Sequence, residues 1–141
     1  MTLSMADGHQ PVLEQRGFVI WKDFPVMGCS PDGIVSFDCD CCTEKLTLLE
    51  IKCPTAVKNS FSGSQPKPPY MTQIQVAMGI LGIPSCDFFV YKSSTDWRQV
   101  TVDFDPEYFQ TCVRAVRMLY SEYLFASLRS SLKHMNRSFA A

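Results

Sequence analysis

The sequence predicts an α/β (α+β) fold in which a mixed central sheet of about five strands is flanked by helices. Two observations support this prediction. Short apolar runs of β-forming residues are bounded by turn residues, and two longer segments repeat apolar residues at the period of an α-helix. Their order is strand, strand, strand, helix, strand, strand, helix. A length of 141 residues suits a single domain, residues 1–141, with a substantial core.

Three strands are expected in the first part of the chain. Residues 17–21 (GFVIW), 33–37 (GIVSF) and 45–52 (KLTLLEIK) are rich in β-forming side chains. The second and third of these are expected to pair as a hairpin, joined by the acidic, cysteine-rich segment 38–42 (DCDCC). Residues 1–10 lack periodicity and are expected to be a loose lead-in.

A surface loop and a buried helix are expected next. Residues 55–69 combine Ser, Gly, Pro and Lys with little apolar periodicity, which favours a loop with at most one turn of helix. Residues 70–82 (YMTQIQVAMGILG) carry apolar side chains at most positions, as is typical of a mostly buried helix. Pro69 suits the start of that helix and Gly82 suits its end.

The last part of the chain predicts two more strands and a second helix. Residues 86–93 and 97–104 are β-forming runs separated by a short polar segment, which predicts a hairpin. From Pro106 the apolar side chains recur near the 3.6-residue period as far as Leu128. This second helix completes the predicted order.

Composition and charge are those of an ordinary globular protein. With 46% hydrophobic and 19% charged residues, the chain has no compositional signature of disorder. The formal net charge of −1 excludes a general attraction to polyanions, so any contact with DNA or RNA must be local. Positive side chains gather late in the chain, as either a nucleic-acid patch or a solvated helix face: Arg114, Arg117, Arg129, Lys133 and Arg137.

The cysteines and the lack of a signal peptide favour a reduced intracellular compartment, nuclear or cytoplasmic. The chain has seven cysteines, an odd number, and no apolar run approaches the ~18 residues of a membrane span. Cys39, Cys41 and Cys42 raise the alternative of a zinc-binding structural domain, although no second cysteine pair lies at a finger-like spacing. An exposed hairpin end is the favoured interpretation of these three thiols.

Residues 30–33 (SPDG) allow two interpretations of Asp32. Pro31 and Gly33 make this segment a good β-turn, in which Asp32 has a purely conformational role. Alternatively, the turn starts a hairpin and leaves the Asp32 carboxylate free to bind a metal ion. The choice depends on what lies beside Asp32 in the next strand.

Glu50 and Lys52 end that otherwise apolar strand. Alternation along a strand puts Glu50 and Lys52 on one face and Ile51 on the other. Two opposite charges on one face of such a strand are costly unless they are paired or bound to something. One interpretation is a plain salt bridge at the sheet edge. In the other, the hairpin brings Asp32 beside Glu50. The two carboxylates and the Ile51 backbone carbonyl then offer oxygen ligands for Mg²⁺, or Mn²⁺ as a substitute, and Lys52 assists phosphodiester hydrolysis.

These motifs resemble those of a known nuclease family. The segments GCSPDGIV (28–35), LLEIKCP (48–54) and YMTQIQVAMGILG (70–82), in that order, are similar to the core motifs of the lambda exonuclease family. These are the YqaJ-like viral recombinase nucleases of the PD-(D/E)XK superfamily. The resemblance runs from about Gly17 to Tyr123. It implies a restriction-endonuclease-like core and a metal-dependent DNA exonuclease, with a role in DNA recombination or repair.

The resemblance also implies a role for each motif residue. It makes Asp32, Glu50 and the Ile51 carbonyl the metal ligands, and Lys52 the catalytic lysine. Gln73 matches a catalytic-site glutamine that points from the following helix toward the active site. Two further positions have supporting roles: Ser30 and Tyr70. The implied partners are DNA, as a duplex end or a single strand, and further copies of the chain in a homo-oligomer.

The chain departs from the family pattern at its start. Family members carry a helical region before the GFVI strand, with a further acidic residue and an arginine, and this N-terminal helical region is expected to be missing here. Only residues 1–16 precede the strand, and Glu14 lies too close to it to take the acidic position. The expectation is either the C-terminal part of a longer protein or a shortened relative. The alternative function is a catalytically impaired nuclease-fold module that binds nucleic acid or a protein partner.

Overall fold

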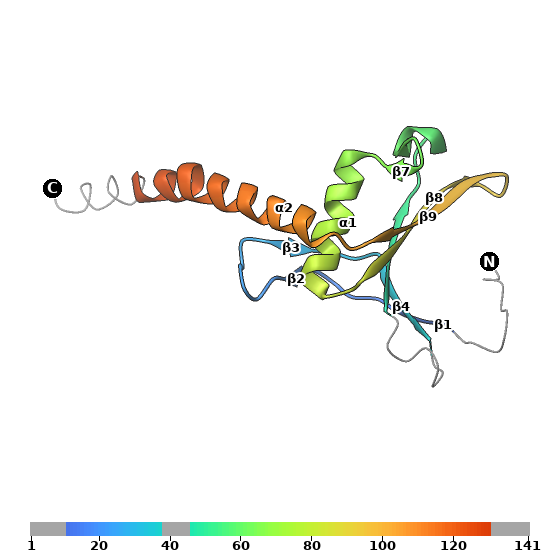
Figure 1. The fold of residues 1–141 in the computed structure, drawn as a ribbon, viewed down its shortest axis with the longest axis horizontal. Helices are drawn as coiled ribbons and strands as arrows, with labels where there is room; N and C mark the ends of the chain where they lie inside the picture. The colour runs from blue at the N-terminus through green and yellow to red at the C-terminus, as the bar shows by residue number, and fades with distance from the viewer. Residues whose placement is uncertain (1–10, 38–45, 131–141) are drawn as a thin grey trace.

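The structure, a computed structural model, describes residues 11–37 and 46–130. It contains a five-stranded sheet in the order β1-β4-β5-β8-β9 (Figure 1). The parallel pair is β5 with β8, and the other neighbours are antiparallel. The predicted mixed sheet flanked by helices is therefore confirmed. The strand bounds are β1 Pro11–Glu14, β4 Gly33–Phe37, β5 Thr47–Lys52, β8 Ser85–Ser93 and β9 Asp96–Asp103.

Helix α1, Pro68–Leu81, packs on the sheet. It begins with two prolines, whose missing N–H groups cost nothing in a first turn, and it ends at Gly82. Gly82 has a φ of 67°, a left-handed conformation that glycine adopts without strain. The helix expected at residues 70–82 is thus present and begins two residues earlier.

Helix α2, Pro106–Leu119, follows β9 directly. The Asp105 side chain caps it by accepting hydrogen bonds from the backbone N–H groups of Glu107 and Tyr108, at 2.9 and 3.0 Å. A single π turn, Tyr120–Leu124, interrupts the α-helical pattern, and helical structure then continues to residue 130. In Figure 1 this long helix projects away from the sheet.

The main core lies between the sheet and α1. Side chains that alternate on β5 and β8 meet the apolar face of α1, as period-two strands and a mostly apolar helix require. The apolar residues with no solvent exposure are Leu48, Ile74, Met78, Cys86, Phe88 and Val90. On β5 the next inward position after Leu48 is Glu50, so the buried row of that strand ends in a carboxylate.

The first predicted strand forms in part, but it does not belong to the predicted sheet. Of residues 17–21, only Val19–Ile20 form a strand, β2, which pairs with β3, Gly28–Cys29, in a separate two-stranded sheet. The edge of the main sheet is occupied by β1 instead. Two turn hydrogen bonds close the β2–β3 connection, from Trp21 N to Met27 O and from Met27 N to Phe24 O, both 2.9 Å. Pairing across so short a loop costs little closure entropy.

The predicted surface loop at residues 55–69 is more ordered than expected. It contains a 3₁₀ turn, Val57–Ser60, which agrees with the single helical turn expected, followed by a small hairpin of β6 (Phe61–Ser62) and β7 (Gln65–Pro66). The side chains of Val57 and Phe61 are buried in the main core. Two apolar side chains in a polar stretch lack the periodicity that marks an element, which is why the sequence did not predict this packing.

Some predictions fall on residues that the structure does not describe. The DCDCC segment, with its alternative of a zinc site, lies outside the described residues, as do Lys133 and Arg137 of the basic gathering. Over residues 11–37 and 46–130, no helix combines the length and apolar character needed to cross a membrane.

Candidate active site

Asp32 and Glu50 lie level with each other at one end of the sheet. The antiparallel register of β4 and β5 pairs Gly33 with Leu49, so Asp32, one residue earlier, stands opposite Glu50. Oδ2 of Asp32 accepts a hydrogen bond from the backbone N–H of Ile51 at 2.7 Å. The chain bends at Asp32 instead of forming the closed β-turn expected for SPDG, because Gly33 already belongs to β4. The hairpin thus juxtaposes the two carboxylates.

Lys52 and Glu50 share one face of β5 and form an ion pair. Nζ of Lys52 donates to Oε1 of Glu50. Only 2% of the Glu50 side chain is exposed, against 24% of the Lys52 side chain, so the lysine reaches from the edge of the core toward solvent. The salt-bridge interpretation is therefore correct as geometry. It does not exclude a catalytic role, since Glu50 lines a cavity.

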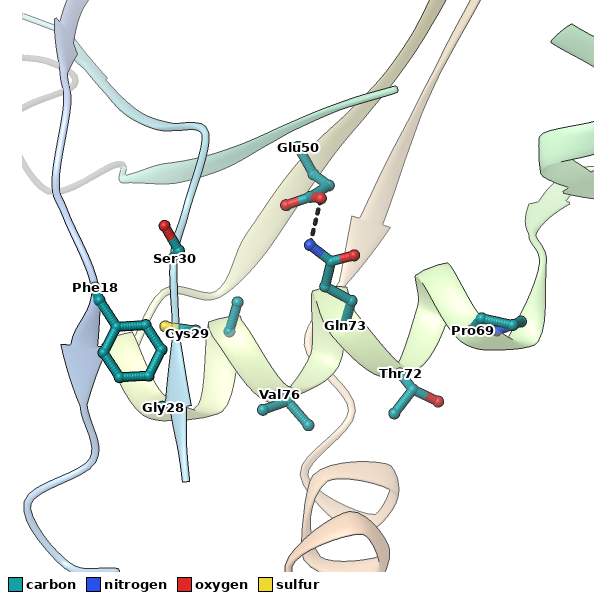
Figure 2. A pocket seen from close by; sticks show the side chains of 10 residues that line it. Phe18, Gly28, Cys29, Ser30, Glu50, Pro69, Thr72, Gln73 and Val76 are labelled. Carbon is teal, nitrogen blue, oxygen red and sulfur yellow. Dashed lines mark hydrogen bonds between the residues drawn. The ribbon is translucent and has the colours of Figure 1, made fainter. Parts of the chain in front are cut away.

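Helix α1 brings Gln73 and Tyr70 to the same place. Nε2 of Gln73 donates a hydrogen bond to Oε1 of Glu50 at 2.6 Å, drawn as the dashed line in Figure 2. The Tyr70 ring centroid lies 5.7 Å from Nζ of Lys52, within cation–π range. Ser30, which precedes the bend at Asp32, lines the cavity beside Glu50. The structure thus brings together the six side chains to which the resemblance gives a role: Ser30, Asp32, Glu50, Lys52, Tyr70 and Gln73.

The electrostatics of the site centre on Glu50. Burial raises the pKa of this carboxyl above its usual 4.5, and the charge of Asp32 raises it further. The hydrogen bonds and charge of Lys52 and the hydrogen bond of Gln73 oppose this rise in pKa. Burial, together with the charge of Glu50, also raises the pKa of the Cys29 thiol. An added cation would therefore find a buried carboxylate whose charge is only partly compensated.

Each carboxylate keeps an oxygen available. Both hydrogen bonds to Glu50 reach Oε1, and the hydrogen bond to Asp32 reaches Oδ2. Among the described residues no hydrogen bond reaches Oε2 of Glu50 or Oδ1 of Asp32. The described residues contain no cluster of three or more His, Cys, Asp or Glu side chains suited to a metal ion. Two carboxylates and a backbone carbonyl suit Mg²⁺, which usually keeps several of its waters and takes one or two carboxylates from the protein.

A cavity of about 460 Å³ opens beside this group. The sequence predicts a site role for only three of its residues: Ser30, Glu50 and Gln73. Gly28 and Cys29 directly precede the SPDG motif, and this position beside the motif is the sequence signal that could have identified them as cavity residues. Phe18 was assigned only to a strand, and no sequence pattern marks it as a cavity residue. The complete lining is Phe18, Gly28, Cys29, Ser30, Glu50, Pro69, Thr72, Gln73, Val76 and Ala77 (Figure 2).

Comparison with solved structures defines the class of fold. The chain is similar to an alkaline exonuclease from Laribacter hongkongensis, with a TM-score of 0.65 and 24% sequence identity. The same enzyme in complex with dAMP gives a TM-score of 0.66, also at 24% identity. In both cases the match covers 95% of this chain and 64% of the exonuclease chain. The fold is therefore that of an alkaline exonuclease, and the chain spans just under two thirds of that enzyme's length.

Sequence comparison then identifies the family. The model of the YqaJ-like viral recombinase domain matches residues 8–84, more than half of the chain. The chain belongs to this family, as its motifs predicted. A comparison with curated proteins gave no match.

Proposed function

We propose that this protein is a divalent-metal-dependent DNA nuclease that hydrolyses phosphodiester bonds, acting as an exonuclease on DNA ends. One observation carries the proposal. Asp32, which directly precedes β4, stands level with Glu50 on the neighbouring strand β5, and Lys52 and Gln73 donate hydrogen bonds to the buried Glu50 carboxylate. Membership of the YqaJ-like viral recombinase domain family supports the same conclusion.

The proposed metal ion is Mg²⁺, with Mn²⁺ as a substitute. Asp32 and Glu50 would hold it through their available carboxylate oxygens, with the backbone carbonyl of Ile51 as a third ligand. A divalent ion in such a site supplies polarisation of the scissile phosphodiester and ionisation of water near neutral pH. Glu50 and Ile51 belong to β5, and Asp32 directly precedes the neighbouring strand β4; sites on rigid elements hold their geometry well.

The protein side chains have distinct tasks in this proposal. Gln73 holds the Glu50 carboxylate in place and leaves its second oxygen free. Lys52 carries the positive charge nearest the buried carboxylate, where it can neutralise charge that develops on the phosphate in the transition state. The ring of Tyr70 limits the positions open to the Lys52 ammonium. Ser30 lies at the cavity edge, where its hydroxyl can donate to a phosphate oxygen.

The test is a cleavage assay on linear duplex and single-stranded DNA with Mg²⁺, Mn²⁺ or EDTA. We expect nucleotide release that EDTA abolishes and that Glu50→Gln and Lys52→Ala each reduce by about a hundredfold or more. Glu122→Gln and Lys92→Ala change the same residue types at exposed positions and should leave the rate unchanged. Cleavage that persists in both site variants would overturn the assignment of roles.

Calorimetry separates this proposal from the alternative of a module without turnover. We expect the wild-type protein to take up Mn²⁺ and Asp32→Asn to lose most of that uptake. DNA binding without Mn²⁺ uptake and without cleavage would instead favour the impaired module. Homo-oligomer formation and a role in recombination or repair stay predictions, and light scattering in solution measures the first of them.

A further inference from the structure

We propose that the ring of Phe18 is the platform on which a nucleobase of the bound DNA strand stacks while its phosphate lies at Glu50. This inference rests on the proposed function and names how the same cavity holds its substrate. Phe18 is 69% exposed, although burying a phenylalanine side chain ordinarily stabilises a protein. Figure 2 shows the ring on one side of the cavity, with Glu50 and Gln73 on the opposite side.

The backbone holds the Phe18 ring in place. The ring lies directly over Gly28: a Cβ atom built on Gly28 would be 2.5 Å from Cζ of Phe18 and 2.8 Å from Cε1. Gly28 pairs with Ile20 across the β2–β3 hairpin. This pairing positions Phe18, the residue directly before β2. Glycine at position 28 thus lets the Phe18 ring approach the strand closely, while most of the residue remains exposed. A preorganised aromatic face loses little conformational entropy when a ligand binds.

The chemistry of the cavity changes from one side to the other. Glu50, which pairs with Lys52, lines the cavity on the side opposite Phe18, and apolar side chains such as Val76 and Ala77 also line it. The Cys29 thiol, whose pKa is raised, stays neutral at physiological pH and adds no charge to the lining. A nucleotide has the same asymmetry, with an anionic phosphate at one end and a flat, largely apolar base at the other.

The size of the cavity agrees with this ligand. Its volume of about 460 Å³ falls within the range of about 300–1,000 Å³ that small-molecule sites occupy. Stacking on an aromatic ring tolerates any base, because every base has a π face. The proposed platform therefore serves an enzyme that digests DNA of any sequence, and it discriminates a base from an abasic sugar.

The experiment is a cycle that combines a protein variant with a substrate variant. Oligonucleotides with an intact or an abasic terminal nucleotide are bound to the full chain in Ca²⁺, and affinities are measured by fluorescence anisotropy. We expect Phe18→Ala to weaken binding of the intact oligonucleotide by between about fivefold and a hundredfold, and to leave binding of the abasic one unchanged. Phe18→Trp should restore the preference for the intact end. Tyr123→Ala removes an aromatic residue of similar exposure, 67%, and serves as the control.

The outcomes separate this inference from the proposed function. Equal weakening of intact and abasic binding, or no weakening of either, would overturn the stacking role. If Glu50→Gln abolishes cleavage while Phe18→Ala shows no dependence on the base, the nuclease assignment holds and this inference fails. If the wild-type chain never cleaves but the base dependence appears, the nuclease assignment fails and the platform stands. In an active enzyme, Phe18→Ala should raise KM more than it lowers kcat.

Discussion

Glu50 is the residue on which the site depends. Strand alternation directs its carboxylate into the core, in line with Leu48, where 1% of the residue is exposed. A buried carboxylate is costly unless hydrogen bonds and opposite charge compensate it, and here Lys52 and Gln73 provide that compensation. Lys52 and Gln73 both lower the pKa of Glu50, but this pKa remains raised because burial has the largest effect.

Replacing Lys52 should raise the pKa of Glu50 further. Lys52→Met removes a hydrogen bond and a positive charge that both favour the ionised carboxyl, while the burial that disfavours ionisation remains. Nuclear magnetic resonance titration of ¹³C-labelled glutamate, on protein kept in EDTA, measures this pKa directly. Lys92→Met, which removes a half-exposed lysine paired with Asp96, is the control and should leave the pKa of Glu50 unchanged. An unchanged or lower pKa in Lys52→Met would contradict the ion pair between Lys52 and Glu50.

At the scale of elements, α1 connects the site to the rest of the fold. Gln73 faces Glu50, whereas Gln75 points to the other side and is 2% exposed. Nε2 of Gln75 donates to the Asp103 carbonyl at 2.9 Å, and its Oε1 accepts from the Asp105 N–H at 2.8 Å. This buried amide ties α1 to the end of β9 and the start of α2. The position of Gln73 therefore depends on contacts made two residues away.

The contact between α1 and α2 is tight at Gly79. A Cβ atom at this position would lie 2.4 Å from the ring of Phe109, which is itself buried. We expect Gly79→Ala to lower the free energy of unfolding by about 1–3 kcal/mol, although alanine favours helix by about 1 kcal/mol over glycine. Urea denaturation measures the change. Gly17→Ala, where the added Cβ meets nothing within 4 Å, should change stability by less than about 0.5 kcal/mol. A gain in stability for Gly79→Ala would show that the two helices are loosely packed.

At the scale of the whole molecule, the candidate active site lowers the stability of the folded protein. The five-stranded sheet and α1 enclose an apolar core that ends in a carboxylate, and the folded protein gives up stability to keep that charge buried. Proteins often carry such a cost at functional sites, where charge is needed for binding or chemistry. Removing the charge should therefore strengthen the fold and weaken the proposed activity together.

The pH dependence of the free energy of unfolding, measured on metal-free protein, tests whether the buried Glu50 charge lowers stability. Because the folded-state pKa of Glu50 is raised above 4.5, the folded protein binds a proton that the unfolded chain has released. The free energy of unfolding therefore falls as pH rises from about 4.5 through the folded pKa. Glu50→Gln has no such loss and should be more stable than wild type at pH 7.5 by about 0.5–2 kcal/mol. Denaturant titrations in EDTA at pH 4 and pH 7.5 measure both proteins, and the gap should be small at the lower pH. A variant less stable than wild type at pH 7.5 would contradict this account.

Several features of the site and fold follow from the sequence alone because they depend on near neighbours. Period-two alternation on β5 puts Leu48, Glu50 and Lys52 on one face, and antiparallel pairing then places Asp32 level with Glu50. The ends of α1 were predicted within two residues, since proline begins a helix and glycine ends one through local backbone preferences. The mixed sheet followed from the order of these local elements.

Other features were decided only by tertiary structure, because they depend on contacts between distant segments. Residues 11–14 joined the main sheet, for which the sequence predicted residues 17–21, since Val19–Ile20 pair locally with Gly28–Cys29. Gln73 and Gln75 are the same residue type, and only the family resemblance singled out Gln73; the packing of α1 is what turns Gln73 toward Glu50 and Gln75 toward Asp103. The open ring of Phe18 was invisible in the sequence for the same reason: the apolar run that contains it predicts burial, and only the folded chain leaves its face free beside the cavity.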